Sequence, residues 1–300
     1  MYETIELFGQ TVDIKNYNCT KCNESIVRTP MKLNLYIKIT DMCNANCEAC
    51  SNRGNEKKSD IDLNKLKMVI KYLDDRDLIN RIGITGGEPM LNINKLNNLL
   101  NAVYEVKPNA LVTINTNGFN IKQIPYLDSK DKIYGIHISR HHYLDEKNDK
   151  FFGIKTASLS DIEKVIDKID NKKLIRLNSL LMKKYINNIE EVSKYLEMAA
   201  NLDIFRVGFV SLMKINDYSK DNFINFNDIF NDLPENFIRT NSLNDLNICE
   251  CVNGLYLGNN GNIVEYYARM TKELNCEYAR QFVYTSDNQL TVGFNKKSLI

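Results

Sequence analysis

Between residues 33 and 210, hydrophobic positions follow two different periods along the chain. Short stretches in which apolar residues alternate with polar ones predict β-strands, and longer stretches in which apolar residues recur every three or four positions predict amphipathic helices. The predicted strands lie near residues 33–40, 81–85, 110–115, 133–139, 173–181 and 204–210. The predicted helices span Leu63 to Leu73, Ile93 to Val106, Leu159 to Ile169 and Ile189 to Ala200.

Six predicted strands alternate with helices, which is typical of an α/β protein with a parallel sheet and right-handed crossovers. Six units predict an open, partial (β/α)6 TIM-like barrel, with its chemistry at the carboxyl ends of the strands. Residues 2–15 and 254–267 each have the pattern of a β-hairpin. We therefore expect three regions: a small N-terminal hairpin with a cysteine pair in 1–30, the barrel in 31–212, and a C-terminal hairpin extension in 213–300.

Composition and charge argue against several classes of function. The 300 residues carry 39 basic and 38 acidic side chains, so the formal net charge of +1 does not favour a general nucleic-acid or membrane-surface binder. The chain has no run of 18 apolar residues, so we expect no membrane span. Its N-terminus lacks a signal-peptide pattern, and it contains eight cysteines. We therefore expect a cytoplasmic protein whose cysteines bind metals rather than form disulfides.

Three of these cysteines lie in one short segment after the first predicted barrel strand. Cys43, Cys47 and Cys50 are separated by three and two residues, and we call residues 43–50 the Cys loop. Three thiolates are one fewer than the four irons of a 4Fe–4S cluster, so one iron would stay open to a small chelating cofactor. A zinc loop or buried thiols are the alternatives, although zinc knuckles usually present two cysteine pairs.

A second motif follows the next predicted strand. Gly86-Gly87-Glu88-Pro89, which we call the GGEP turn, ends that strand. Paired glycines allow a ligand to approach the backbone closely, and Glu88 offers a carboxylate to a cationic group. The turn is weak evidence alone, but it is strong evidence when it follows the Cys loop.

Together the two motifs resemble the radical S-adenosylmethionine (radical SAM) superfamily, over roughly Leu33 to Val210. The resemblance implies that the three cysteines of the Cys loop hold a 4Fe–4S cluster and that SAM chelates its open iron. It also implies that the GGEP turn, Gly86, Gly87, Glu88 and Pro89, binds SAM through its methionyl amino group. The family usually has an aromatic residue before the third cysteine, near the adenine, and here Ala49 stands there. Another part of the chain would then have to stack on the adenine.

Further candidate SAM ligands lie at the ends of later predicted strands. Asn117 follows the third strand and Ser139 ends the fourth, where small polar residues of the family often touch the SAM ribose. Asn178 lies in the fifth strand, in a segment that resembles one where relatives present Asn to SAM. A purely structural role is the alternative for each of the three.

Histidines follow the fourth predicted strand. His141 and His142 are two of only three histidines in the chain. Over the mouth of a barrel they could bind substrate or carry a proton, and a solvated loop is the alternative. His137 lies within the strand, and we expect it to be a satisfied core histidine.

The remaining cysteines suggest a second metal site. The segment that begins at Cys251 resembles the start of a twitch or SPASM extension, a module that holds auxiliary 4Fe–4S clusters in radical SAM enzymes. The usual cysteine after its hairpin is absent, so we expect at most one auxiliary site. Its ligands would be Cys19, Cys22, Cys251 and Cys276, with Cys249 as a substitute for either C-terminal member. A structural zinc bound by Cys19, Cys22, Cys249 and Cys251 is an alternative, and free buried thiols are another.

The resemblance implies an enzyme that accepts an electron from a flavodoxin- or ferredoxin-type donor and cleaves SAM to a 5′-deoxyadenosyl radical, which abstracts hydrogen from a substrate. Modification of a ribosomally made peptide is the favoured activity, although the short N-terminus leaves no space for a leader-binding domain. Oxidation or rearrangement of a small molecule or nucleotide is the second candidate. A non-catalytic iron–sulfur or zinc regulatory protein is the third, and the GGEP turn argues against it.

Overall fold

The structure is a computed structural model. It describes residues 2–15, 32–52, 59–169, 171, 174–225, 227–230, 238–239, 255–257, 261–267, 281–293 and 298–300.

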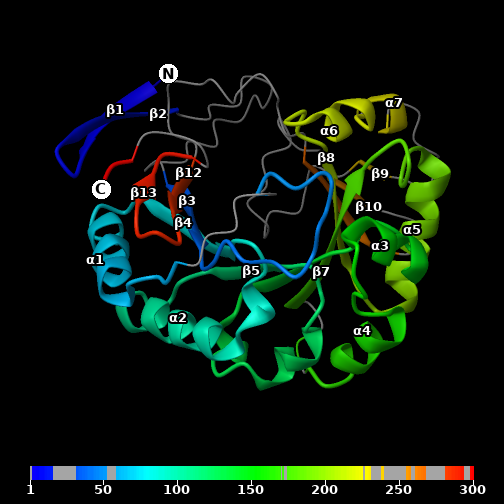
Figure 1. The fold of residues 1–300 in the computed structure, drawn as a ribbon, viewed down its shortest axis with the longest axis horizontal. Coiled ribbons are helices and arrows are strands. Elements are labelled where there is room, and N and C mark those ends of the chain that lie inside the picture. Colours follow the sequence, from blue (N-terminus) through cyan, green and yellow to red (C-terminus); the bar gives the residue numbers. More distant parts are fainter. Residues whose placement is uncertain are drawn as a thin grey trace.

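The described residues form one large sheet with helices on its outer side (Figure 1). All six predicted barrel strands are present, neighbours in the chain pair side by side, and every one of these pairs is parallel. The partial-barrel prediction is therefore confirmed. The strands are β3 (Leu33–Lys38), β4 (Ile79–Thr85), β5 (Val112–Thr116), β6 (Gly135–Ser139), β7 (Ile175–Leu181) and β8 (Arg206–Ser211).

The four predicted helices are also present, with small differences at their ends. They are α1 (Leu63–Asp74), α2 (Ile93–Val106), α4 (Leu159–Ile166) and α5 (Ile189–Asn201). The sequence pattern missed several short helices because they contain too few turns, and too many polar residues, to show a period. These are α3 (Asp145–Phe152), α6 (Asp217–Asp221), α7 (Asn227–Phe230) and the 3₁₀ helices η1 (Pro89–Leu91), η2 (Ile121–Tyr126) and η3 (Lys130–Lys132).

Each barrel strand separates an apolar face from a polar one. On β3, Leu35 and Ile37 belong to the buried core beneath the helices, whereas Tyr36 and Lys38 point to the opposite face and are only half-buried. Part of the same alternation is seen on β6, where Ile136 and Ile138 are buried and His137 and Ser139 are half-buried. Because the helices lie outside the curved sheet, the polar side chains line its inner side, which we call the concave face (Figure 1).

The C-terminal region adds strands to both edges of the barrel sheet. The predicted hairpin is confirmed, since β10 (Leu255–Leu257) pairs antiparallel with β11 (Ile263–Tyr267). However, β11 also pairs in parallel with β8, and β12 (Gln281–Tyr284) pairs in parallel with β3 at the opposite edge. The described sheet thus contains eight parallel strands, β12-β3-β4-β5-β6-β7-β8-β11, and its edges carry β9 (Ile238–Arg239), β10 and β13 (Leu290–Thr291).

The predicted N-terminal hairpin is confirmed as β1 (Tyr2–Leu7) paired with β2 (Gln10–Lys15). Phe8 in its turn stacks on Tyr72 of α1, with ring centroids 4.0 Å apart. The side chain of Gln10 donates to the carbonyl oxygen of Leu299 at 3.0 Å. The hairpin therefore lies between α1 and the C-terminal end of the chain (Figure 1).

Candidate active site

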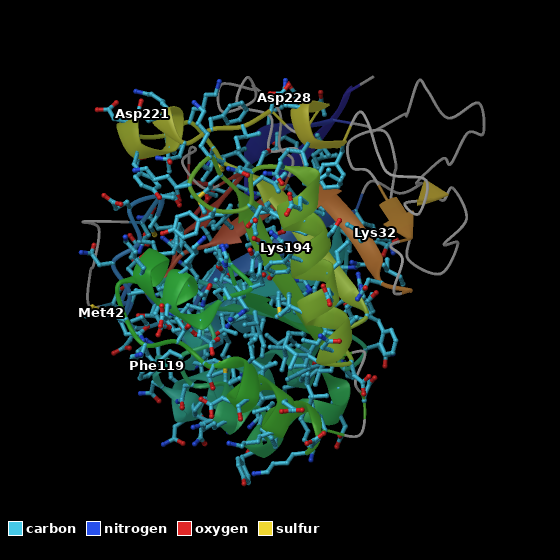
Figure 2. All side chains as sticks on the ribbon, turned by 90° about the vertical axis from the view of Figure 1, so that its right-hand side faces the viewer. Lys32, Met42, Phe119, Lys194, Asp221 and Asp228 are labelled. Atoms are coloured by element: carbon cyan, nitrogen blue, oxygen red, sulfur yellow. The ribbon has the colours of Figure 1, made fainter. Side chains whose placement is uncertain are left out.

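The Cys loop begins just beyond the carboxyl end of β3. Figure 2 shows Met42 and Phe119 on the same side of the barrel, with Lys32 at the far side, so the loop lies at the mouth formed by the strand ends. None of its three cysteines forms a disulfide. Backbone amides of Ala45 and Asn52 donate to the sulfurs of Cys43 and Cys50, at 3.4 Å and 3.3 Å. Such hydrogen bonds favour the thiolate forms that metals bind.

The chemistry of this segment fits an iron–sulfur cluster. Burial raises the pKa of the Cys43 thiol, so binding of iron would release its proton. Beside Cys43, the side-chain nitrogen of Asn44 is buried with no hydrogen-bond partner among the described residues. A buried donor without an acceptor is costly, so a cofactor that bears acceptors would satisfy it. Within the described part of the chain, no three His, Cys, Asp or Glu side chains are grouped to hold a single metal ion.

The GGEP turn packs directly on the Cys loop. Backbone amides of Gly87 and Glu88 donate to the carbonyl oxygens of Thr40 at 2.7 Å and Met42 at 2.9 Å. A β-carbon at Gly86 would lie 2.3 Å from the Thr40 oxygen, and one at Gly87 would lie 1.9 Å from the Met42 oxygen. The close contact between the two motifs therefore requires glycine at both positions, before any role in ligand binding is considered.

The carboxylate of Glu88 points into the protein and is only 1 % exposed. Its Oε1 accepts from the Met90 amide at 2.9 Å and the Thr116 hydroxyl at 2.6 Å, and its Oε2 accepts from the Asn117 amide at 2.6 Å. Burial raises the pKa of Glu88 above its usual value, although these hydrogen bonds oppose the rise. Oε2 can accept one more hydrogen bond, which leaves room for the predicted contact with a cationic amino group.

Asn117 joins the two motifs through its side chain. Its Nδ2 donates to Asn44 Oδ1 at 2.9 Å and lies 3.9 Å from Cys43 Sγ, within reach of a hydrogen bond to sulfur. Its Oδ1 accepts from the Phe119 amide at 2.9 Å. The sequence predicted a SAM ligand here, and the structure places the side chain against the Cys loop.

A network of four side chains ties the two ends of the Cys loop together. Lys38 Nζ lies 2.7 Å from Asp41 Oδ1 and donates to Asn52 Oδ1 at 3.2 Å, and Asn52 donates back to the Asp41 carbonyl at 3.1 Å. Ser286, which follows β12, donates its hydroxyl to Asp41 Oδ2. Burial opposes ionisation of Asp41, but the bonds from Lys38 and Ser286 hold its pKa below the usual value. We call these four residues the loop clasp.

The loop clasp was not predicted from the sequence. Ser286 is 245 positions from Asp41, and no motif links them. The only available signal was the polar residue at each end of the Cys loop.

Ser139, the last residue of β6, is paired with Asn178, which lies in the middle of β7. Their contact with SAM stays a prediction. Asn178 Oδ1 accepts from Arg176 Nε at 2.9 Å. A β-carbon at Gly208 of β8 would lie 2.1 Å from Arg176 and 2.3 Å from Asn178 Oδ1. Gly208 therefore leaves the space in which this pair lies on the concave face.

His141 and His142 are buried rather than solvated. The His141 ring accepts from the Leu180 amide at 3.1 Å, and His142 Nδ1 accepts from the Leu144 amide at 3.0 Å. Burial, together with the charge of Lys147, lowers the pKa of His142 to about 4. Both rings therefore have structural contacts, and their contact with substrate stays a prediction.

The expectation for His137 is wrong in one respect. Its ring lies on the half-buried concave face of β6, not in the apolar core, and it contacts Asn115 Oδ1 at 3.3 Å. The strand alternates, and the helix-facing positions are Ile136 and Ile138.

An apolar cluster lies against the Cys loop. Phe152 belongs to it, and its carbonyl oxygen accepts from the Asn46 amide at 3.0 Å. Ala49, which replaces the family's aromatic residue, packs against this cluster. The buried members are Phe151, Phe152, Met182 and Leu212, and the half-buried aromatic members are Tyr185, Tyr218 and Phe223.

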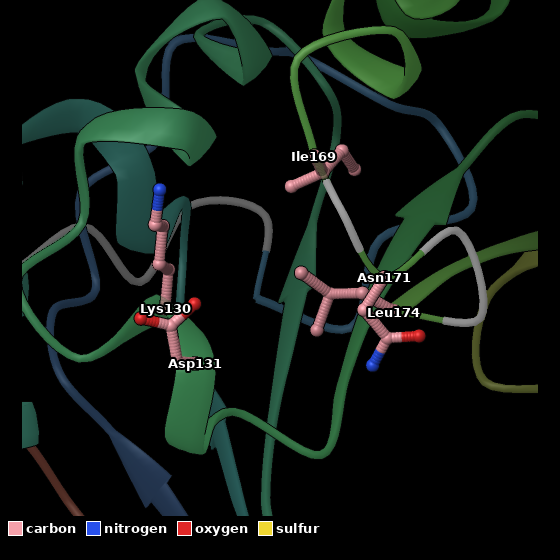
Figure 3. Close-up of a pocket in the computed structure, with 5 residues that line it drawn as sticks. All are labelled: Lys130, Asp131, Ile169, Asn171 and Leu174. Atoms are coloured by element: carbon pink, nitrogen blue, oxygen red, sulfur yellow. The ribbon is translucent and has the colours of Figure 1, made fainter.

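Two other features lie apart from this site. A hollow of about 100 Å³ lies among residues that precede β6 and β7 in the chain, including Lys130, Asp131 and Leu174 (Figure 3). It is therefore at the amino ends of these strands, whereas the Cys loop follows the carboxyl end of β3. The predicted auxiliary ligands, Cys19, Cys22, Cys249, Cys251 and Cys276, lie outside the described residues.

The comparisons with known proteins agree with this geometry. The model of the radical SAM superfamily matches residues 37–199, more than half of the chain. The chain therefore belongs to the radical SAM superfamily, and it is an enzyme of that class. The family implies a 4Fe–4S cluster and SAM as cofactors.

Two individual relatives each share less than 30% sequence identity with this chain. The chain is 29% identical over 198 residues to a GTP 3′,8-cyclase of Clostridium acetobutylicum, covering 62% of this chain and 58% of that protein. It is 26% identical over 293 residues to the uncharacterized protein MJ0907 of Methanocaldococcus jannaschii, covering 83% and 96%. The chain thus spans less than two thirds of the cyclase.

The fold resembles that of SuiB from Streptococcus suis, in the crystal structure with bound S-adenosylmethionine. The TM-score is 0.59 at 14% identity, over 89% of this chain and 63% of that chain. At this identity the likeness concerns the fold.

No described helix is long and apolar enough to cross a membrane.

Proposed function

We propose that Cys43, Cys47 and Cys50 hold a 4Fe–4S cluster and that the GGEP turn binds SAM beside it. When bound, these cofactors supply a 5′-deoxyadenosyl radical that abstracts a hydrogen atom from the substrate. The observation that carries the proposal is the hydrogen-bonded unit of the Cys loop, the GGEP turn and Asn117 at the mouth of the barrel.

The protein's own residues would bind and orient SAM and shield the site from water. Glu88, held by three hydrogen bonds, presents its remaining acceptor capacity to the methionyl amino group. Ser139 and Asn178 lie on the concave face, where they would contact the nucleoside part of SAM. The apolar cluster beside Ala49 excludes water from one side of the Cys loop and offers aromatic side chains in place of the missing one.

For the substrate, two candidates have support. Peptide modification is supported by the resemblance of the C-terminal segment to a SPASM extension. The overall likeness to SuiB, one structure of which contains a precursor peptide, concerns the fold only. Chemistry on a small molecule or nucleotide is supported by the sequence likeness to GTP 3′,8-cyclases and by the basic side chains of the concave face. A flavodoxin- or ferredoxin-type protein is the proposed electron donor for both.

Cofactor content tests the metal part of the proposal. Anaerobic reconstitution should incorporate about four irons per cluster. Replacement of Cys43, Cys47 and Cys50 by alanine should remove these irons. If the wild type retains no iron, or if the triple variant retains all of it, the cluster assignment is wrong. If the triple variant loses part of the iron and keeps the rest, the iron that remains would belong to an auxiliary site.

A further inference from the structure

The side-chain amides of Asn117 and Asn44 form a short relay of hydrogen bonds with a fixed direction. The backbone amide of Phe119 donates to Asn117 Oδ1 at 2.9 Å, so Asn117 presents its Nδ2 on the other side. This Nδ2 donates to Asn44 Oδ1 at 2.9 Å. Because a backbone N–H can only donate, it fixes the orientation of both side-chain amides. Asn44 therefore presents a donor, its Nδ2, on the side away from Asn117. We call these two side chains the amide relay.

The last atom of the amide relay is a buried donor. Asn44 Nδ2 is shielded from water, and it has no hydrogen-bond partner in the part of the chain that the structure describes. The other amide atoms of the relay, Oδ1 and Nδ2 of Asn117 and Oδ1 of Asn44, each have a partner. An N–H group that is removed from water and left unpaired destabilises the protein. The relay thus fits a bound group that supplies an acceptor to Asn44.

The position of the relay indicates which group this is. Asn117 Nδ2 contacts both Asn44 Oδ1 and Cys43 Sγ, at 2.9 Å and 3.9 Å, so the Asn44 amide lies beside a sulfur that would bind iron. In the chain, Asn44 lies between Cys43 and Cys47, two of the proposed ligands. The sulfur atoms of an iron–sulfur cluster accept hydrogen bonds from the protein, and these bonds tune its reduction potential.

We propose that Asn44 donates a hydrogen bond through Nδ2 to a sulfur of the 4Fe–4S cluster, and that this bond raises the reduction potential of the cluster. The inference rests on the proposed function, since it concerns the cluster assigned there. A cluster gains negative charge when it accepts an electron, so an N–H donor beside it stabilises the reduced form more than the oxidised form. Asn44 would thereby favour the electron transfer that precedes SAM cleavage.

The reduction potential of the reconstituted protein tests the inference. It is measured anaerobically and without SAM, by a redox titration followed by electron paramagnetic resonance. Asn44→Ala removes the donor, so the ratio of reduced to oxidised cluster at a fixed potential should fall by roughly threefold or more, as expected for the loss of one hydrogen bond. Asn46→Ala is the matched control, because Asn46 lies in the same loop and is exposed. This control should titrate as the wild type does.

Asn44→Asp is the second variant, and it decides the question should Asn44→Ala lose its iron. It keeps an oxygen that accepts from Asn117 and replaces the donor by a negatively charged oxygen. Its potential should therefore lie below that of the wild type and of Asn44→Ala. Asn46→Asp introduces the same charge at the exposed position, where water screens it, so it should lower the potential less.

Three results would overturn the inference. Asn44→Ala could hold a full cluster with the wild-type potential, or Asn44→Asp and Asn46→Asp could titrate alike. Asn44→Ala could also lose affinity for SAM at an unchanged potential, which would assign the donor to SAM instead.

The proposed function is tested separately, by the iron content of the wild type and its cleavage of SAM. Cleavage together with equal potentials in the wild type and Asn44→Ala contradicts the inference alone. A shifted potential in Asn44→Ala, with no SAM cleavage by the wild type, contradicts the proposed function alone. A wild type without a cluster contradicts both.

Discussion

At the scale of single residues, the site depends on side chains that hold other groups in place. Glu88 accepts three hydrogen bonds from the protein, and Asn117 connects the GGEP turn to Asn44 and Cys43. Both lie where the motifs predicted chemistry, but their visible contacts are with the protein. Their effect on the cofactor is therefore expected through position and hydrogen bonding.

Asn117→Ala should lower the reduction potential of the cluster. The variant removes an N–H group that points at Cys43 Sγ, and hydrogen bonds to cluster sulfurs raise the potential. A redox titration followed by electron paramagnetic resonance measures the change. Asn101→Ala, an exposed position on α2, is the control and should leave the potential unchanged. Equal potentials in wild type and Asn117→Ala would show that this contact does not act on the cluster.

His142 should make folding stability depend on pH. Burial lowers its pKa to about 4 in the folded state, whereas the unfolded chain has the ordinary value of 6.5. Between these values the unfolded chain binds a proton that the folded state does not, so the free energy of unfolding falls as the pH falls from about 6.5 to about 4. His142→Asn keeps an acceptor for the Leu144 amide and should show a smaller fall. Urea unfolding at pH 7.5 and 5.5 measures both, and equal falls would contradict the assignment.

At the scale of elements, the alternation of apolar and polar residues was enough to locate the six barrel strands and four helices. Each pattern reports burial within one strand or helix, which is a local property. Strands β11 and β12 were missed as members of the barrel sheet because a local pattern does not show which partner a strand pairs with. The hairpin of β10 and β11 was predicted from its own residues, but its pairing with β8 was not.

The contact between the Cys loop and the GGEP turn predicts a sharp difference between two glycines. Gly87→Ala would place a β-carbon 1.9 Å from the Met42 oxygen, so the two motifs must move apart. We expect the variant to lose most of its bound iron and its affinity for SAM.

Gly153→Ala is the matched control for Gly87. Gly153 has a positive φ of 67°, but a β-carbon there would meet nothing within 4 Å. It should cost on the order of 1 kcal/mol of stability and leave the iron content unchanged. Iron analysis and equilibrium binding of SAM measure both variants. Full iron and unchanged affinity in Gly87→Ala would refute the proposed contact between motifs.

At the scale of the whole molecule, the described strands β11 and β12 of the C-terminal region join the barrel sheet, and the segment after β12 contacts the residues that precede the Cys loop. Strand β12 pairs with β3, and Ser286 beyond it bonds to Asp41 just before the Cys loop. The residues of the Cys loop and of the GGEP turn are contiguous in the chain, so both motifs could be recognised from the sequence alone. The sequence could not reveal the loop clasp, because the clasp combines residues that are far apart in the chain.

Ser286→Ala should loosen the Cys loop without changing its ligands. The variant leaves the buried Asp41 carboxylate without one donor, which costs about 1–3 kcal/mol. We expect a mild chelator to remove iron from this variant faster than from the wild type. The decay of cluster absorbance measures the rate. Asp287→Ala, at the exposed position directly after Ser286, is the control. Identical decay in the two variants would mean that the C-terminal region does not stabilise the cluster.

The central claim is tested most directly by measuring 5′-deoxyadenosine after the reconstituted protein is mixed anaerobically with SAM and dithionite. We expect the wild type to form 5′-deoxyadenosine and methionine, and the triple variant of Cys43, Cys47 and Cys50 to form neither. A wild type that contains a full complement of iron but leaves SAM intact would contradict the account.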